Sequence, residues 1–517
     1  LLRASADIEA GAGLLEYGRG KAESVLIDEA SLSMFFDGET DSIAIEQGVF
    51  VSGYNRIQYS GNIGLVRDGQ RNITAFDLAL SSSNIALALD NATKKPVAFS
   101  WASLKVKVVP SPFSVEITKA VIGARHLQLN LSGYVRDAPL SPEIYLEGSG
   151  RSIPADVIKR LWPTSLAPGT REWIGRNVQA GKIKDARFKI HLLPGEAARA
   201  RTGTPIADDH IQVKFNIRKA RFTFMKGLPA IENADGQGLL AGDQLNIRLT
   251  RGRIKAPSGG WVRVKKGRFG IPKIHEDVTL GKTNGFVRAS VTGPTKNILE
   301  ILDMKPLEYI SIMNIRPQAV GGTATGKLDL RIPLEQDLTL DQITIRIKAE
   351  LKNTRIDQLY KGVDLDNGNS VLTVNNKGLE ARGKIALNGV PFSLKWNERF
   401  VTTKKLTTRF ELGGAIDDRA RKALGINLKS VLRGPVTLKL VARARRGKLA
   451  TAHVKAELKR AELRQNDIKW KKPKGIPASL SFDLDFPAEK QLRLRNLDLK
   501  GKNLKLTGAI RLDDRRD

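Results

Sequence analysis

The sequence predicts a mainly β fold, in which a long, repetitive antiparallel sheet curls into an elongated groove and carries a few short helices. Three observations lead to this prediction. Apolar and polar residues alternate with period two in many segments. Turn-type residues separate these segments at short intervals. Aromatic residues make up only 6% of the 517 residues, which is few for the cores of compact β-sandwiches.

Each alternating segment has one apolar face and one polar face, and the apolar faces must be buried against something. About 30 strands at a spacing of about 4.8 Å would form a trough on the order of 150 Å long. A trough lined by Leu, Ile and Val stays open unless a ligand fills it, and acyl chains match such a lining. We expect the groove to be lined by alternating residues in six segments: Leu127, Leu129, Leu131, Val213, Phe215, Ile217, Leu245, Ile247, Leu249, Ile343, Ile345, Ile347, Leu438, Leu440, Phe482 and Leu484.

A degenerate repeat underlies the alternation. A glycine follows three alternating positions at Gly133, Gly383 and Gly508, and a further alternating pair follows each glycine. Turn-type sequences at 265–267, 366–368 and 374–378 predict tight turns between strands. The pattern indicates consecutive hairpins laid side by side in a quasi-one-dimensional array.

Helical patterns divide the chain into four predicted segments. Residues 1–150 form a first groove segment, and 151–182 form a helical insertion. Residues 183–415 form a second groove segment, with short helices near 295–313. A helix from Asp417 to Leu424 opens the last segment, 416–517, which is otherwise basic and β-rich. The insertion has a proline near its first helix start and stops that helix at Pro163, and a second helix starts near Thr170 and ends at Gly181.

Composition restricts the function further. The net charge of +31 favours anionic partners, although the first 50 residues are acidic and the stretch 443–474 is densely basic. Nucleic acid is not expected as a partner, because Trp470 is the one stacking aromatic within that basic stretch apart from His453. No run of 18 apolar residues is present, so we expect nothing in this segment to span a membrane. Because the chain begins and ends within a strand pattern, we expect it to be a segment of a longer protein, with any anchor outside it.

No motif in the sequence carries catalytic chemistry. The five histidines have no metal-ligand spacing, and no thiol is available because cysteine is absent. The triad Asp208, Asp209 and His210 is expected to be a polar loop before a strand. We therefore expect no enzyme activity, no metal and no cofactor.

The insertion also carries a resemblance. Residues Leu161 to Ile183, followed by the strand 185–190, resemble the signature of the AsmA-like envelope proteins, in particular the YhdP-type branch, which is related to TamB. Its specific residues, for which we expect a structural role, are Trp162, Pro163, Pro168, Arg171, Trp173 and Gly181.

The resemblance implies a bridge for lipid transfer, held in the inner membrane by an anchor and extending through the periplasm of a Gram-negative bacterium. The implied partners are phospholipid acyl chains and the inner membrane, with an outer-membrane or periplasmic protein as a further candidate. An alternative is an envelope scaffold or regulator that assists assembly of outer-membrane proteins or surface polymers. Charged residues on the inward face of several successive strands would count against the lipid conduit.

Overall fold

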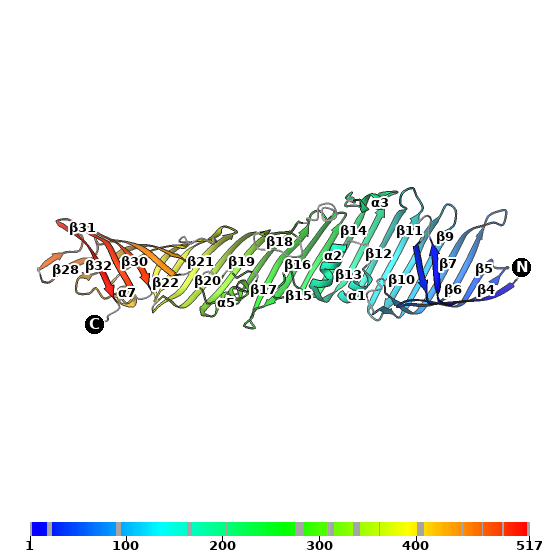
Figure 1. The fold of residues 1–517 in the computed structure, drawn as a ribbon, viewed down its shortest axis with the longest axis horizontal. Coiled ribbons are helices and arrows are strands. Elements are labelled where there is room, and N and C mark those ends of the chain that lie inside the picture. Colours follow the sequence, from blue (N-terminus) through cyan, green and yellow to red (C-terminus); the bar gives the residue numbers. More distant parts are fainter. Residues whose placement is uncertain are drawn as a thin grey trace.

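The computed structural model describes residues 3–513 except 18–22, 89–94, 163–167, 203, 275–283, 306, 309, 311–314, 334–341, 361, 401–407, 446–447, 468 and 489–490. One sheet of 27 strands dominates these residues and extends along the molecule (Figure 1). Its N-terminal half consists of β1 (Arg3–Ala10), β4 (Glu29–Asp37), β5 (Ser42–Ser52), β6 (Asn55–Arg67), β7 (Ile73–Leu87), β8 (Val97–Phe99), β9 (Trp101–Val109), β10 (Ser114–Ala124), β11 (Leu127–Arg136), β12 (Glu143–Pro154), β13 (Val178–Leu192), β14 (Ile211–Phe222), β15 (Ile231–Ala241) and β16 (Gln244–Lys255).

The sheet continues without a break to the C-terminal end. Its remaining strands are β17 (Trp261–Ile271), β18 (Asn284–Pro294), β19 (Val320–Pro333), β20 (Thr344–Tyr360), β21 (Val363–Asn375), β22 (Gly378–Leu387), β23 (Val390–Arg399), β24 (Thr408–Ile416), β26 (Val436–Arg445), β27 (Lys448–Glu457), β30 (Ala478–Ala488), β31 (Gln491–Gly501) and β32 (Leu504–Asp513). Two small sheets stand apart from it: β2 (Gly13–Tyr17) with β3 (Glu23–Ile27), and β25 (Leu432–Arg433) with β28 (Glu462–Gln465) and β29 (Trp470–Lys472).

Neighbouring strands of the large sheet follow one another in chain order, and every pair is antiparallel. Because β8 and β9 both pair with β7, the 27 strands occupy 26 positions, and a spacing of about 4.8 Å gives a length of roughly 120 Å. The prediction of a long antiparallel β-sheet is confirmed. The sheet runs through the predicted segment borders, since β12 spans residue 150 and β13 spans residue 182.

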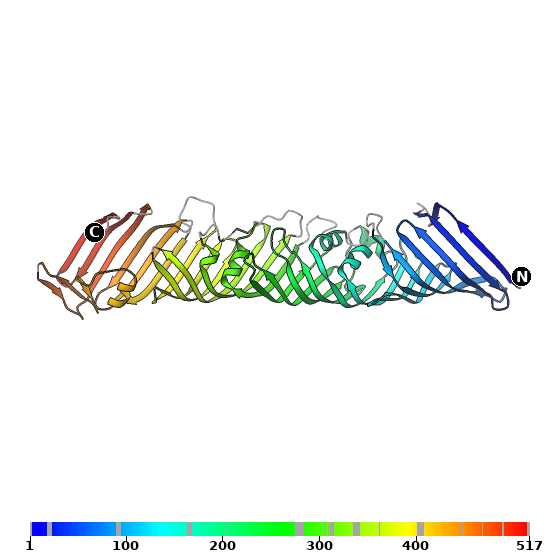
Figure 2. The same cartoon turned by 90° about the horizontal axis from the view of Figure 1, so that it is seen from below.

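β-bulges bend the strands and curl the sheet. The pairing register shifts within β14, β15, β17, β20 and β21, among others, and each of these shifts contains a residue with positive φ. Such an extra residue bends its strand and increases the local twist. In Figure 2 the strands of the bent sheet cross one another over the middle of the molecule, as expected for an elongated groove.

Two of the three predicted turns proved to be bulges. The turn at 374–378 joins β21 to β22, as predicted. Residues 265–267 lie inside β17, where Lys266 has a φ of 52°, and 366–368 lie inside β21, where Asn367 has a φ of 49°. Turn-type residues adopt positive φ in both settings, so local sequence alone does not separate a turn from a bulge.

The antiparallel order gives the groove two edges, which Figure 1 shows as a lower and an upper edge. The lower edge carries the connections β12–β13, β14–β15, β18–β19 and β24–β26, with helices α1 (Ala155–Leu161), α2 (Pro168–Asn177), α5 (Thr295–Leu302) and α7 (Asp418–Ala423). The upper edge carries the connections β13–β14, with helix α3 (Glu196–Arg201), β15–β16, β17–β18 and β19–β20. A 3₁₀ turn, η1 (Pro317–Ala319), leads into β19.

The predicted helices compare as follows. The first helix of the insertion is α1, which begins directly after Pro154, the proline that we expected near its start and that is also the last residue of β12. The second is α2, and its predicted end at Gly181 is wrong, because the chain already enters β13 at Val178. α5 and α7 lie where helices were predicted, and most of the predicted helix at 307–313 falls outside the described residues. α3 was not predicted.

Buried clusters lie mainly where lower-edge elements cover the sheet. α1 places Val157 against Ile85, Phe99 and Leu127. The largest cluster joins β22–β24 and β26 to α7 and the β25–β28–β29 sheet. Within the described residues, the helices are all too short or too polar to span a bilayer.

Candidate functional site: the apolar face of the sheet

Cross-strand register places the apolar residues of successive strands on one face. Residues directly opposite each other in an antiparallel pair point to the same side of the sheet. One such row runs over ten strands, from β11 to β20, through Leu129, Gly150, Ala186, Phe215, Gly238, Ile247, Phe269, Val287, Leu330 and Ile345. Every member of this row is apolar or glycine.

Similar rows extend the apolar face toward both ends. In the N-terminal part a row links β4 to β10 through Phe36, Ile43, Ile63, Leu78, Val106 and Ile117. In the C-terminal part a row links β22 to β30 through Gly383, Leu394, Leu412, Leu440, Val454 and Phe482. The face is therefore apolar along nearly the whole sheet.

The residues singled out from the sequence lie on this face. Leu127, Leu129 and Leu131 share one side of β11, and the same holds for the sets on β14, β16, β26 and β30. Ile345 and Ile347 lie on this side of β20, and Ile343, which immediately precedes that strand, is buried beside Ile345. Sequence reasoning missed Phe269, although it alternates with Ile271 at the end of β17.

Glycines on the face leave space for aromatic rings. A Cβ at Gly238 would lie 2.0 Å from the Phe215 ring, and one at Gly148 would lie 2.5 Å from the Phe188 ring. Phe188 and Phe215 are directly opposite these glycines on the neighbouring strands. The rings therefore lie over the glycine backbone rather than against another side chain. At these points the apolar surface rises little above the sheet.

Charges are concentrated on the opposite, polar face. Arg248, Arg268 and Arg288 are exposed and directly opposite one another on β16, β17 and β18. The three apolar rows described above contain no ionisable side chain. Glu398, near the upper edge of β23, is an exception on the apolar side; it is opposite Leu379 and accepts a hydrogen bond of 3.4 Å from the Trp396 indole N–H.

The carboxyl of Asp235 has a shifted pKa and stabilises the fold. Asp235 sits at the bulge of β15, and burial raises the pKa of its carboxyl. Hydrogen bonds from the Lys219 amide and from the guanidinium groups of Arg251 and Arg218 lower that pKa more, so it lies below its ordinary value. Among the described residues no three His, Asp or Glu side chains come together as a metal site.

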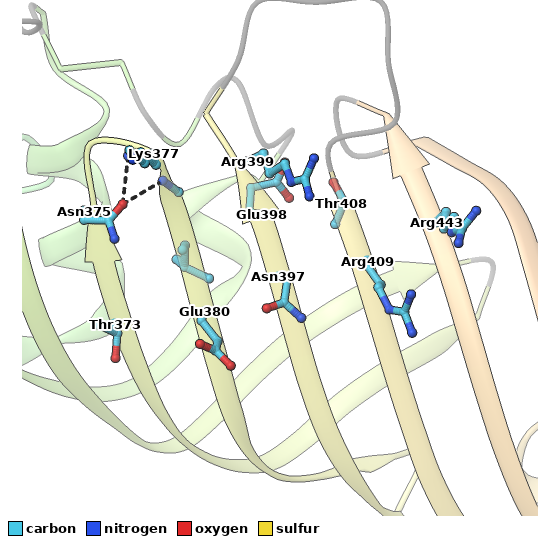
Figure 3. A pocket seen from close by; sticks show the side chains of 12 residues that line it. Thr373, Asn375, Lys377, Glu380, Asn397, Glu398, Arg399, Thr408, Arg409 and Arg443 are labelled. Carbon is cyan, nitrogen blue, oxygen red and sulfur yellow. Dashed lines mark hydrogen bonds between the residues drawn. The ribbon is translucent and has the colours of Figure 1, made fainter.

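A polar cavity of about 600 Å³ lies near the upper edge of β21–β24 and β26 (Figure 3). Its lining includes one cross-strand row of polar side chains. At the rim, the backbone amides of Lys377 and Gly378 donate to Asn375 Oδ1 at 2.8 and 3.2 Å. The cavity does not suit acyl chains, because its lining is mostly polar: Thr373, Asn375, Lys377, Gly378, Leu379, Glu380, Asn397, Glu398, Arg399, Thr408, Arg409 and Arg443.

The tryptophan-containing insertion lies on the lower edge of the apolar face. Arg171 Nε donates to the Trp162 carbonyl at 3.1 Å, which ties the start of α2 to the end of α1. Lys159 Nζ donates to the carbonyls of Gly175, at 3.0 Å, and Val178, which fixes α1 to the end of α2. Trp173 stacks on Phe269 of β17, with ring centroids 6.3 Å apart.

The remaining motif residues have separate positions. Pro168 is the first residue of α2, where its fixed φ suits a helix start, and Pro163 lies outside the described residues. Gly181 has a φ of 123° at a bulge of β13, and a Cβ there would lie 2.6 Å from Ala220 Cα. Only glycine allows the two strands to approach so closely.

Comparison with known proteins gives one match. The family model described as YhdP protein matches residues 68–514, which covers most of the chain. No curated protein and no solved structure matches it.

Proposed function

Because the chain belongs to the YhdP family of envelope proteins, we propose that it is a non-enzymatic conduit that moves phospholipid between the inner and outer membranes. In this proposal the acyl chains lie along the apolar face of the sheet, in the periplasm of a Gram-negative bacterium. An anchor outside this segment holds the protein at the inner membrane. A protein of the outer membrane or periplasm is the proposed partner at the far end.

The observation that supports the proposal is the continuity of the apolar face. Ten successive strands, from β11 to β20, contribute only apolar residues or glycine to one row. A chain folded into several compact two-layer domains does not need an uninterrupted apolar row, since each domain buries a separate core of its own. A ligand that slides needs it, because any charge on the path would have to be desolvated at each passage.

Energetics favours a groove over free diffusion. Moving a phospholipid through water exposes about 30 methylenes at about 0.8 kcal/mol each, or roughly 25 kcal/mol. A continuous apolar surface removes most of this barrier. The proposed role therefore requires shape and hydrophobicity and no catalytic group.

The test is native mass spectrometry with lipid extraction on the chain purified from bacterial membranes in mild detergent. We expect phospholipid to co-purify, and we expect Ile247→Asp and Leu440→Asp to lower the amount bound severalfold. Arg248→Asp and Lys439→Asp are matched controls, because they place an aspartate on the adjacent residue of the same strand, on the polar face.

The controls decide the interpretation. Equal loss of lipid in the apolar-face variants and the polar-face variants would contradict the proposed path. A well-folded chain that carries no lipid would contradict the conduit and favour the scaffold or regulator. The folded state of each variant is checked by circular dichroism.

A further inference from the structure

In the middle of the chain, a helix of the lower edge contacts a strand end at the upper edge of the groove. Trp173 belongs to α2, which leads into β13 at the lower edge. Its stacking partner Phe269 lies two residues before the end of β17, at the upper edge. The opposite partner of Phe269 is Ile247, near the start of β16, which also lies at the upper edge. The aromatic stack therefore crosses the mouth of the groove.

A second contact crosses the mouth nearby. Met225 lies in the lower-edge connection between β14 and β15. It packs against Ile332, Ile343 and Ile345, which lie at the end of β19 and the start of β20 on the upper edge. These contacts are apolar and involve no ion pair.

The two crossing segments are joined to each other. The Thr223 amide donates to the Asn177 carbonyl at 2.9 Å, and the Thr223 hydroxyl donates to Asn177 Oδ1 at 3.3 Å. Asn177 ends α2, and Thr223 begins the β14–β15 connection. We call α2 together with residues 223–230 the clasp, because it acts as one unit on the lower edge.

A phospholipid headgroup cannot easily pass the part of the groove that the clasp crosses. In an open groove the acyl chains lie on the apolar face while the headgroup stays in water. Under the clasp the headgroup would lose its water beside Phe269, Ile247 and Val287, none of which can donate or accept a hydrogen bond through its side chain. Burying an unpaired charged or polar group is strongly unfavourable.

We infer that the clasp is a headgroup gate, in which the Trp173–Phe269 and Met225 contacts open for each lipid and discriminate between lipids by headgroup size. This inference rests on the proposed function. Trp173 and Phe269 are then specificity-determining residues of the conduit. A small headgroup requires only separation of the two rings, whereas a large one requires displacement of the whole clasp.

The contact itself is tested without lipid. The chain has no cysteine, so Trp173→Cys with Phe269→Cys introduces a single pair that a short bismaleimide can join. We expect efficient crosslinking of this pair and none of Trp173→Cys with Phe410→Cys on the distant strand β24. Reactive but uncrosslinked cysteines at 173 and 269 would overturn the gate.

Transfer is then measured between two vesicle populations attached to opposite ends of the chain, with fluorescent phosphatidylethanolamine as the probe. We expect the crosslinked pair to stop transfer while native mass spectrometry still finds lipid bound to the chain. The same double variant without crosslinker is the control. Undiminished transfer through the crosslinked chain would overturn the gate and leave the proposed function intact, whereas lipid-free chains in every sample would overturn both.

Selectivity is tested with phosphatidylethanolamine that carries a polyethylene glycol headgroup. We expect Trp173→Ala to raise its transfer relative to the unmodified lipid by roughly two- to tenfold, the range that one aromatic pair supports. Trp173→Phe keeps a stacking ring and should keep the wild-type ratio. An unchanged ratio in a folded Trp173→Ala variant would overturn the assignment of Trp173 as a specificity-determining residue.

Discussion

Two covers lie on the lower edge of the same sheet, and they differ in how they are built. The C-terminal cover consists of α7 and the β25–β28–β29 sheet. It packs against β22–β24, β26 and β27 as a dry core in which Leu458 is 1% exposed and Ala461 is fully buried. The clasp meets the far edge of the groove through one aromatic stack and one methionine. The first cover is therefore a fixed core over the lower-edge ends of these strands, and the second rests on contacts that can separate.

Polar groups reinforce this difference. Lys472 is buried in the C-terminal cover, and its ammonium, which has three N–H donors, lies 2.7 to 3.0 Å from four carbonyl oxygens, those of Leu458, Ala461, Pro473 and Ile476. Burial lowers the pKa of this ammonium. A cation held in this way fixes the cover to the chain around it. The clasp has no comparable buried ion among its described residues, and the hydrogen bonds described above hold its parts to each other.

The largest expected effect follows from the dry core. Leu458→Ala would leave a cavity that the surrounding strands cannot fill, and we expect it to destabilise the C-terminal cover by about 4 kcal/mol. Native-state hydrogen exchange of β28 and β29 measures this loss locally. Ile426→Ala is the matched control, because Ile426 is 42% exposed in the same region. Equal effects of both variants would contradict a dry core.

Lys472→Met should destabilise the same cover by about 3 kcal/mol, because it keeps the volume of the side chain but leaves four carbonyls without their donor. Hydrogen exchange of the β25–β28–β29 sheet is again the measurement. Lys471→Met serves as the control, since the neighbouring Lys471 is exposed and pairs with Glu462 at 3.3 Å. A Lys472→Met variant as stable as the wild type would mean that the hydrogen bonds from the ammonium to these carbonyls are not needed for stability.

The sequence predicted the sheet well because its determinants are local. Alternation within each strand sets the apolar face, and short connections impose antiparallel neighbours, so residues such as Ile247 and Leu440 could be assigned to one surface. Bulges could not be predicted in the same way. Lys266 and Asn367 stand in turn-type sequences, and only the pairing partner of the strand shows that the chain continues.

The contact between the clasp and the upper edge could not be predicted from local sequence patterns, for a different reason. Trp173 was expected to have a structural role, but its partner Phe269 follows almost a hundred residues later, and no pattern in the sequence connects the two. The contact exists because the curled sheet brings the end of β17 within reach of α2. Long-range geometry of this kind depends on the sum of many small bends and is therefore absent from any single motif.

Acid should loosen the C-terminal cover in a defined way. The Gly434 amide donates to Asp418, and this hydrogen bond lowers the pKa of that carboxyl; burial raises it, and the Arg421 guanidinium lowers it again, so the pKa lies below its ordinary value of 3.8. The stabilisation is present above that value and is lost as pH falls through the lower, folded-state pKa. Asp418→Asn should remove this acid dependence, as measured by hydrogen exchange of Leu432–Gly434. Asp467→Asn, at an exposed site, should leave it unchanged.

The smallest effect on stability is expected at the clasp. Trp173 and Phe269 are both half-buried and contribute one stacked pair, so Trp173→Leu should cost about 1 kcal/mol or less. Hydrogen exchange of α2 and β17 should rise slightly, while β13 and β14 keep their protection because their own ladder is untouched. A loss of several kcal/mol, as in Leu458→Ala, would mean that the clasp is fixed across the mouth of the groove, and a gate built on it could not open at the rate that lipid passage requires.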